Sequence, residues 1–322
     1  MKQYIIRRIL TSIIVLFGVS FLLYGIIRMM PGDFVQQMTS GNPEITAEQK
    51  EKLREQYGIG GSVIEGYVNW VKGAVKLDFG DSFKYKEPVM KVISERMWVS
   101  FSLAAIALII ELAIAIPLGV IAATKQYSKT DYTIVFFALA GISLPSFFFA
   151  ALLRRVFAIG LKVLPLSGMV TARAHYTGIA YYLDVAEHFI LPITVFVILG
   201  IGSWLRYTRT NMLEVLNMDY VRTARAKGLD ERVVVFKHAF RNTLIPIVTF
   251  IGAQIPALFS GAIITEGIFS IPGLGKAAID AVNEKDLPFL MGYLVFLAVL
   301  TLLGTLISDI LYAVVDPRVR YN

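Results

Sequence analysis

The chain has 322 residues, of which 56% are hydrophobic and 17% are charged, whereas a soluble protein of this size carries about 25% charged residues. It has no cysteine and three scattered histidines, which excludes a disulfide framework and gives no metal-ligand spacing. The net charge of +7 could suit nucleic acid, but the basic residues gather between long apolar runs. We therefore expect a membrane protein that binds no metal, cofactor or nucleic acid.

Six apolar segments are each long enough to cross a membrane, because one crossing takes about 20 residues. In chain order they lie near 9–29, 99–123, 132–155, 189–207, 245–266 and 288–312. The first is too long for the apolar core of a signal peptide, and no cleavage pattern follows it. The sequence therefore predicts an all-α integral membrane protein with six transmembrane helices and a single domain, 1–322.

The flanks of these segments predict the orientation, because short cytoplasmic loops are enriched in Lys and Arg. With the N-terminus inside, the cytoplasmic pieces hold 15 of the 31 basic residues, and both termini are cytoplasmic. The segment 30–98 then lies outside as an insert, in which ten acidic residues offset nine basic ones. Arg154 and Arg155 fall at the outer end of the third span, where we expect them to reach the lipid headgroups.

The insert is expected to form a small lid-like subdomain with short helices. Thr46 is predicted to cap the first of them, after Pro43 and Glu44. An amphipathic helix is predicted from Val63 to Val75, before a turn at 78–82.

The loop between the fourth and fifth spans, 209–245, is basic and amphipathic. Gly228 divides it into two short helical halves and suits a helix end that needs a positive φ or a close backbone approach. Ala224 leaves room for a close neighbour. On charge alone, a solvated loop is the simpler interpretation, and a docking surface for a partner protein is the alternative.

The order of residues in this loop favours the docking surface. Arg222-Thr-Ala224-x-x-x-Gly228 resembles the EAA motif of ABC importer permeases, with Arg in place of the usual Glu. The fuller string YVRTARAKGL, followed by HAFRN, resembles the oligopeptide/dipeptide/nickel branch of that family. The segments YIIRR, PGD, GDS, LPSF, LPLSG, PGLG and DPR extend the resemblance over nearly the whole chain. The long insert and short N-terminus are similar to those of the first of two paired permease subunits.

This resemblance implies a type I ABC importer permease (MetI-like) fold in a bacterial-type inner membrane. It implies a coupling helix at 219–230 that docks on an ATPase, through Arg222, Thr223, Ala224, Arg225, Lys227, Gly228 and Leu229. The implied partners are a second homologous permease, two cytoplasmic ATPases and an extracytoplasmic substrate-binding protein. The expected cargo is a peptide, with oligopeptides ahead of dipeptides or nickel chelates.

Glu111 lies midway along the second span, where an acidic side chain costs about 3 kcal/mol on insertion scales. We expect it either to serve the translocation pathway, by contacting a peptide's amino group or relaying a proton, or to lie between helices, protonated or paired with Ser or Thr. An ion-gradient-driven secondary transporter is an alternative class, but it predicts internal repeats and several such acids. A non-transporting anchor would leave the basic loop unexplained.

The segment Gly273-Leu-Gly-Lys276 lacks the spacing of a phosphate-binding loop, and we predict a turn there. No nucleophile and base stand together in the sequence. The chain itself is therefore not expected to be an ATPase or another enzyme.

Overall fold

The computed structural model describes residues 2–29, 31–39, 45–56, 59 and 61–315, and these residues form helices without a β-strand. The elements in chain order are α1 (Lys2–Met29), α2 (Phe34–Thr39), α3 (Ala47–Gln56), α4 (Val63–Ala74), α5 (Val89–Thr124), α6 (Lys129–Ser143), α7 (Ser146–Leu153), the π-helix η1 (Arg154–Gly160), α8 (Ile179–Leu216), α9 (Asp219–Ala226), α10 (Glu231–Val233), the π-helix η2 (Val234–Phe240), α11 (Arg241–Ser260), α12 (Ile263–Phe269), α13 (Leu274–Glu284) and α14 (Leu287–Val315).

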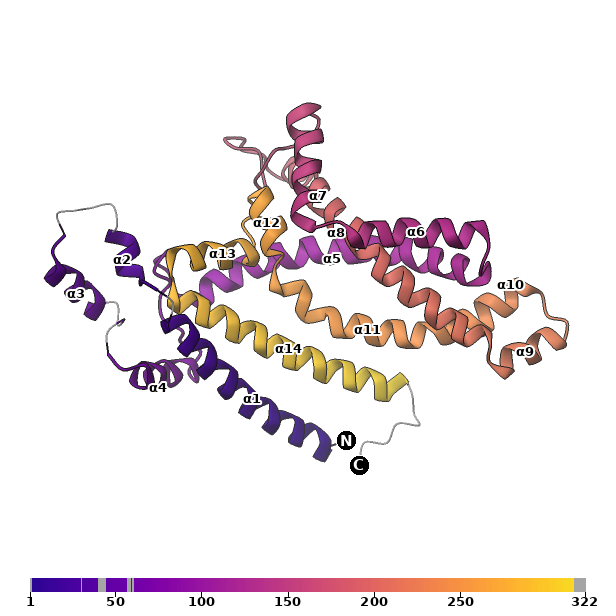
Figure 1. The fold of residues 1–322 in the computed structure, drawn as a ribbon, viewed down its shortest axis with the longest axis horizontal. Helices are drawn as coiled ribbons and strands as arrows, with labels where there is room; N and C mark the ends of the chain where they lie inside the picture. Colours follow the sequence, from indigo (N-terminus) through magenta and orange to yellow (C-terminus); the bar gives the residue numbers. More distant parts are fainter. Residues whose placement is uncertain (1, 30, 40–44, 57–58, 60, 316–322) are drawn as a thin grey trace.

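Five helices of the described chain are long and apolar enough to cross a membrane, and one bent pair makes a sixth candidate span. The five are built on α1, α5, α8, α11 and α14. In Figure 1, α5 runs along α8, and α11 runs along α14. Ala115, Leu205 and Ile247 are buried where α5, α8 and α11 meet. The prediction of an all-helical membrane protein is confirmed.

The third predicted span, 132–155, is a bent pair of helices and not one straight helix. α6 and the α7–η1 pair meet at 96°. Leu144 between them is extended, with φ −79° and ψ 129°, because Pro145 disfavours the α conformation of the residue before it. The Arg154 guanidinium donates to the carbonyl oxygen of Ile268 at 2.8 Å, and its contact with lipid headgroups stays a prediction. Arg155 is exposed.

The fifth span ends at Ser260 and not near 266, and a separate short helix, α12, follows it. Glu266 in α12 is fully buried, and its carboxylate accepts hydrogen bonds from Ser100 Oγ (2.8 Å), from Lys276 N (3.0 Å) and from Ala262 N (3.0 Å). Gly273 is the N-cap of α13. The Gly273–Lys276 segment is therefore a helix start, in which the Lys276 amide donates to Glu266 and the Leu274 amide donates to Ser100 Oγ.

The two helices predicted within the insert are present. Thr46 Oγ1 accepts from Gln49 N, and Gln49 Oε1 accepts from Thr46 N, which is a capping box at the start of α3. Pro43 and Glu44 lie outside the described residues. The predicted amphipathic helix is α4.

The insert is fixed to the first residues of α14. The Asp286 carboxylate is fully buried and accepts from Ser82 Oγ, from Lys84 N at 3.1 Å and from Phe289 N at 3.1 Å. The last of these bonds caps α14. One side chain thus joins the 80–88 turn of the insert to a membrane helix.

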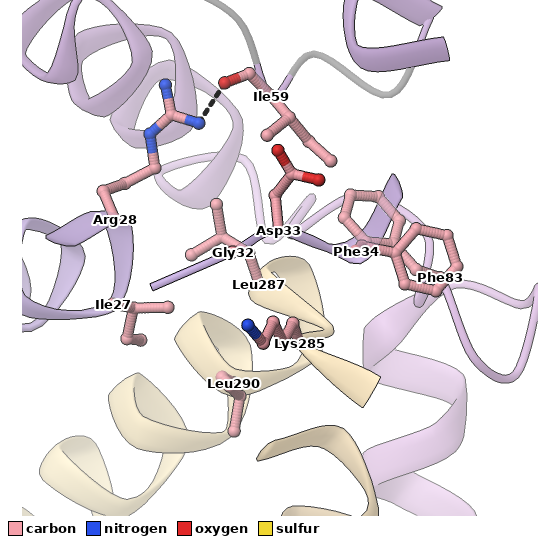
Figure 2. Close-up of a pocket in the computed structure, with 10 residues that line it drawn as sticks. All are labelled: Ile27, Arg28, Gly32, Asp33, Phe34, Ile59, Phe83, Lys285, Leu287 and Leu290. Carbon is pink, nitrogen blue, oxygen red and sulfur yellow. Dashed lines mark hydrogen bonds between the residues drawn. The ribbon is translucent and has the colours of Figure 1, made fainter. Parts of the chain in front are cut away.

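A small pocket marks the seam where the insert meets the ends of α1 and α14. Figure 2 shows Arg28 reaching the carbonyl oxygen of Ile59, with Lys285 on the opposite side of the pocket. Lys285 Nζ donates to the carbonyl oxygen of Pro31. The backbone of the insert is therefore held from the end of α1 and from the turn between α13 and α14.

Asp286→Ala should loosen the insert. The change removes a helix cap and leaves buried donors unpaired, so we expect a loss of about 3 kcal/mol in stability. Hydrogen exchange in detergent should show faster exchange in the 80–88 turn, together with a lower midpoint of thermal unfolding.

Asp280→Ala is the matched control, because the Asp280 side chain is 22% exposed and its ion pairs in the described part of the chain are with two lysines, Lys84 and Lys276. Such a pair contributes less than about 1 kcal/mol. Equal effects of the two substitutions would contradict the assigned role of Asp286.

Candidate functional site

The predicted docking loop forms a compact projection at one end of the molecule. α9 follows directly from α8, and α10 and η2 lead back into α11. In Figure 1 this projection lies at the right, opposite α2 and α3. The predicted division into two helical halves at Gly228 is confirmed.

Gly228 ends α9 with φ +74°. Its N–H donates to the carbonyl of Arg225 at 2.9 Å, and the N–H of Leu229 donates to that of Ala224 at 3.4 Å. These two bonds are the Schellman arrangement, whose left-handed residue is usually glycine. A Cβ on Gly228 would meet nothing within 4 Å. The glycine is therefore required for its backbone angle and not for close approach.

The inner face of α9 packs against its own chain. Val221 is fully buried and Ala224 is 5% exposed. Both belong to a cluster, here called the loop core, that joins α5, α8, α9 and η2 through Val120, Ala123, Met212, Val221, Ala224, Val234, Val235 and Ala239. Ala224 therefore does leave room for a close neighbour, but that neighbour is this chain's own loop core.

The predicted basic docking residues differ in what they contact. Arg225 forms a two-pronged pair with Glu231, with Nη2 to Oε1 at 2.7 Å and Nε to Oε2 at 3.2 Å. This hydrogen bonding raises the pKa of Arg225 above its ordinary value. Arg222 lies 3.6 Å from Asp219, with 68% and 97% of the two side chains exposed. Lys227 is exposed. Arg222 and Lys227 thus face outward, while Arg225 braces α9 against α10.

The outward face of the projection, here called the loop surface, mixes apolar and basic side chains. Its exposed members are Met218, Tyr220, Arg222, Lys227, Leu229, Arg232, Val233, Phe236, Lys237 and Arg241. Two exposed aromatic residues, Tyr220 and Phe236, are not among the predicted docking residues, and Phe236 is 60% exposed. The exposure of Phe236 could have been predicted from the sequence. Residues 233–236 are four consecutive apolar residues, and they cannot all face the core from one helix.

An ion pair with a buried carboxylate anchors the base of the projection. Arg209 on α8 donates to both carboxylate oxygens of Asp131, at 2.8 and 2.7 Å. The Asp131 side chain is 3% exposed, and Tyr127 N donates to it at 3.0 Å. The pair ties the turn between α5 and α6 to the part of α8 that leads into α9.

Glu111 lies between α5 and α8, where it is 8% exposed. A Cβ on Gly200 of α8 would touch its carboxylate. The carboxyl group is thus packed against a neighbouring helix of the same chain, and its role in translocation stays a prediction. Among the described residues, no group of three His, Cys, Asp or Glu could hold a metal ion.

Two family models cover the chain. Residues 115–321 match the binding-protein-dependent transport system inner membrane component, and residues 1–104 match the N-terminal part of the same membrane component. A chain of the MetNI methionine ABC transporter, solved in inward-facing conformations, has the same fold with a TM-score of 0.54 at 13% identity. The likeness covers 70% of this chain and 97% of that one.

Curated relatives match over the full length. The oligopeptide transport system permease protein AppB of Bacillus subtilis is 40% identical, and the dipeptide transport system permease protein DppB of Escherichia coli is 36% identical, each over 100% of both chains. A putative peptide permease protein of Brucella ovis is 35% identical over 99% of both chains. The prediction of a permease subunit with a type I importer fold is confirmed: the chain belongs to the family of binding-protein-dependent transport system inner membrane components.

Proposed function

We propose that this permease moves peptides, with oligopeptides as its main cargo, into the cell, and that ATP hydrolysis in partner subunits drives it. The observation that carries the proposal is the full-length similarity, at 40% identity, to an oligopeptide permease. The dipeptide permease at 36% keeps dipeptides as the second candidate cargo. Family membership argues against the ion-gradient alternative.

The cargo is tested with the complex that contains this chain. Purified complex in liposomes should take up a labelled pentapeptide in an ATP-dependent way, and more slowly a dipeptide. Preferred uptake of the dipeptide would move the assignment to the second cargo. Uptake without ATP, with no ATPase recovered alongside the chain, would overturn the ATP-driven mechanism.

The loop surface is the proposed docking site for an ATPase. Its charge and exposed aromatic side chains suit a protein groove, since aromatic residues and Arg are enriched at interfaces. The loop core supports this role because it joins α9 to α5 and α8. Closure of two ATPases on ATP would therefore move these helices together with the loop.

The remaining partners and the orientation follow the same proposal. A second homologous permease would complete the pathway, and a substrate-binding protein would deliver cargo to the insert, 30–98. The loop 209–245 and both termini would be cytoplasmic in a bacterial-type inner membrane. Figure 1 supports this arrangement, because α2 and α3 lie at the end of the molecule opposite α9.

Gly228→Val should uncouple ATP hydrolysis from uptake. Valine at φ +74° is strained, because a left-handed conformation costs about 1–2 kcal/mol for an L-residue. Gly228→Asn is the matched control, since Asn tolerates this conformation best among non-glycine residues. We expect peptide uptake per ATP hydrolysed to fall sharply for Val and mildly for Asn. Equal behaviour of the two variants would show that the backbone angle at this position does not matter.

Charge reversal of the outward basic residues should weaken docking. Arg222→Glu with Lys227→Glu is expected to reduce recovery of the ATPases with the permease and to abolish most ATP-driven uptake. The matched control is Lys125→Glu with Lys129→Glu, which changes the net charge equally at the exposed α5–α6 turn. It should leave ATPase recovery and ATP-driven uptake nearly unchanged. Loss in both double variants would point to a general effect of charge and not to the loop surface.

Glu111→Gln tests the pathway role of that carboxyl. The amide fills the same space against Gly200, so we expect uptake close to the unmodified level at every pH if the group only packs. Gly200→Ala should lower thermal stability, because the added methyl group overpacks the contact. A pH-dependent loss of uptake in Glu111→Gln would instead support a place in the translocation pathway.

A further inference from the structure

α4 has three distinct faces. One packs on α1: Tyr67 Oη lies 2.9 Å from Ser20 Oγ and donates to the carbonyl of Phe17 at 3.1 Å. The approach is close, because a Cβ on Gly66 would touch the hydroxyl of Tyr24. α4 is therefore held along the side of a membrane-spanning helix, as Figure 1 also shows.

The second face is an exposed apolar stripe. Ile64, Val68 and Val75 are 66%, 45% and 73% exposed, and their spacing places them on one side of the helix. The third face, offset by one residue, carries the exposed polar side chains Glu65, Asn69 and Lys72. A single exposed apolar side chain needs no explanation, whereas a continuous stripe marks a surface that another apolar phase covers.

A cavity of about 240 Å³ lies between α1, α4 and α14. Its lining is apolar apart from one serine and one tryptophan, and includes Ile13, Leu16, Phe17, Val71, Ala74 and Val295. Ile13 and Phe17 are themselves 45% and 46% exposed on the outside of α1. The cavity is thus continuous with an exposed apolar helix surface, and a recess of this kind holds hydrocarbon in preference to water.

Aromatic side chains gather where α4 meets α1. The rings of Tyr67 and Trp70 stack at 6.0 Å, and Tyr24 and Phe21 lie against Tyr67 at 5.7 and 5.1 Å. Trp70 Nε1 is buried without a hydrogen-bond partner among the described residues. Tyr and Trp concentrate where a membrane protein crosses the boundary between hydrocarbon and headgroups.

We propose that α4 contacts the hydrocarbon of the bilayer, and that its Ile64–Val68–Val75 stripe and the adjoining cavity bind the acyl chains of phospholipids. Acyl chains suit this place because the stripe and the cavity adjoin exposed apolar side chains of α1, a membrane-spanning helix. The leaflet is the outer one, a point that rests on the proposed orientation. The lipid contact itself does not depend on that orientation. The consequence is that the insert is held at a fixed depth by the bilayer as well as by α14.

The natural chain has no cysteine, which allows a direct test. Val68→Cys and Asn69→Cys, one residue apart on the two exposed faces, are each spin-labelled in the full complex in phosphatidylethanolamine–phosphatidylglycerol liposomes. Collisions with oxygen, which concentrates in lipid, are compared with collisions with a water-soluble nickel chelate. We expect the oxygen-to-nickel ratio to be several-fold higher at position 68 than at position 69.

Two results would overturn the proposal. A ratio typical of water at both positions would mean that the stripe faces solvent. Protection of position 68 from both reagents would mean that a protein partner covers it, such as the second permease or the binding protein. Ile64→Cys and Glu65→Cys provide an independent pair on the same two faces.

The orientation is measured separately, by reaction of Asn69→Cys with a membrane-impermeant maleimide added outside intact cells. Labelling from outside places α4 at the outer leaflet. Labelling only after the cells are opened would overturn the orientation and the leaflet while leaving the lipid contact to the spin-label result.

Discussion

The contact on which the proposed mechanism depends is the apolar packing beneath α9. Burial of one valine side chain stabilises a fold by about 1.5–3 kcal/mol, and Val221 and Val234 in the loop core are fully buried. The pair of Arg225 and Glu231 contributes less, because both side chains are exposed, at 43% and 61%, and such pairs contribute below about 1 kcal/mol. The loop is therefore held by packing, and a force applied to it reaches α5 and α8 directly.

The ion pair of Asp131 and Arg209 adds a second connection, which is electrostatic. Removing Arg209 would leave the Asp131 carboxylate, which is 3% exposed, without its counter-charge. The pair makes the first turn of α6 follow α8. At the other side of the 96° bend, α7–η1 is joined to α12 through Arg154 and Ile268. The bent span therefore has one arm tied to the loop end and one arm tied to the α12–α13 end.

Much of this arrangement could be predicted from the sequence, because it follows from local rules. Apolar run length located the spans, and the turn chemistry of Gly228 and the capping at Thr46 depend on neighbouring residues alone. The bend at Leu144 could also be predicted, because Pro145 disfavours the α conformation of the residue before it. The uninterrupted apolar run across this position instead favours one continuous span.

Other features depend on contacts that no local pattern encodes. Ser82 and Asp286 are 204 positions apart, and Glu266 receives two of its three bonds from other helices, through Ser100 of α5 and Lys276 of α13. A small residue such as Ala224 predicts that another surface comes close, but it does not show whether that surface belongs to a partner or to this chain. Here it belongs to this chain. The resemblance predicts that Arg225 contacts the same partner, and its bond to Glu231 could not be predicted because it crosses a turn, outside the i,i+4 spacing of a helix.

α8 is the element that can link the two ends of the molecule. It has 38 residues, which corresponds to about 57 Å at 1.5 Å per residue. At one end it carries Arg209 and leads into α9. At the other end Asp184 accepts from Thr171 N and Oγ1, at 2.8 and 2.6 Å, and holds the segment before α8.

α5 packs along α8, and at Gly119 and Gly200 any added Cβ would meet the facing helix. Two helices in such close contact resist bending apart, because interiors at this density have no space to yield. A displacement of the loop would then be carried along α5 and α8 together and appear at the end where the insert lies.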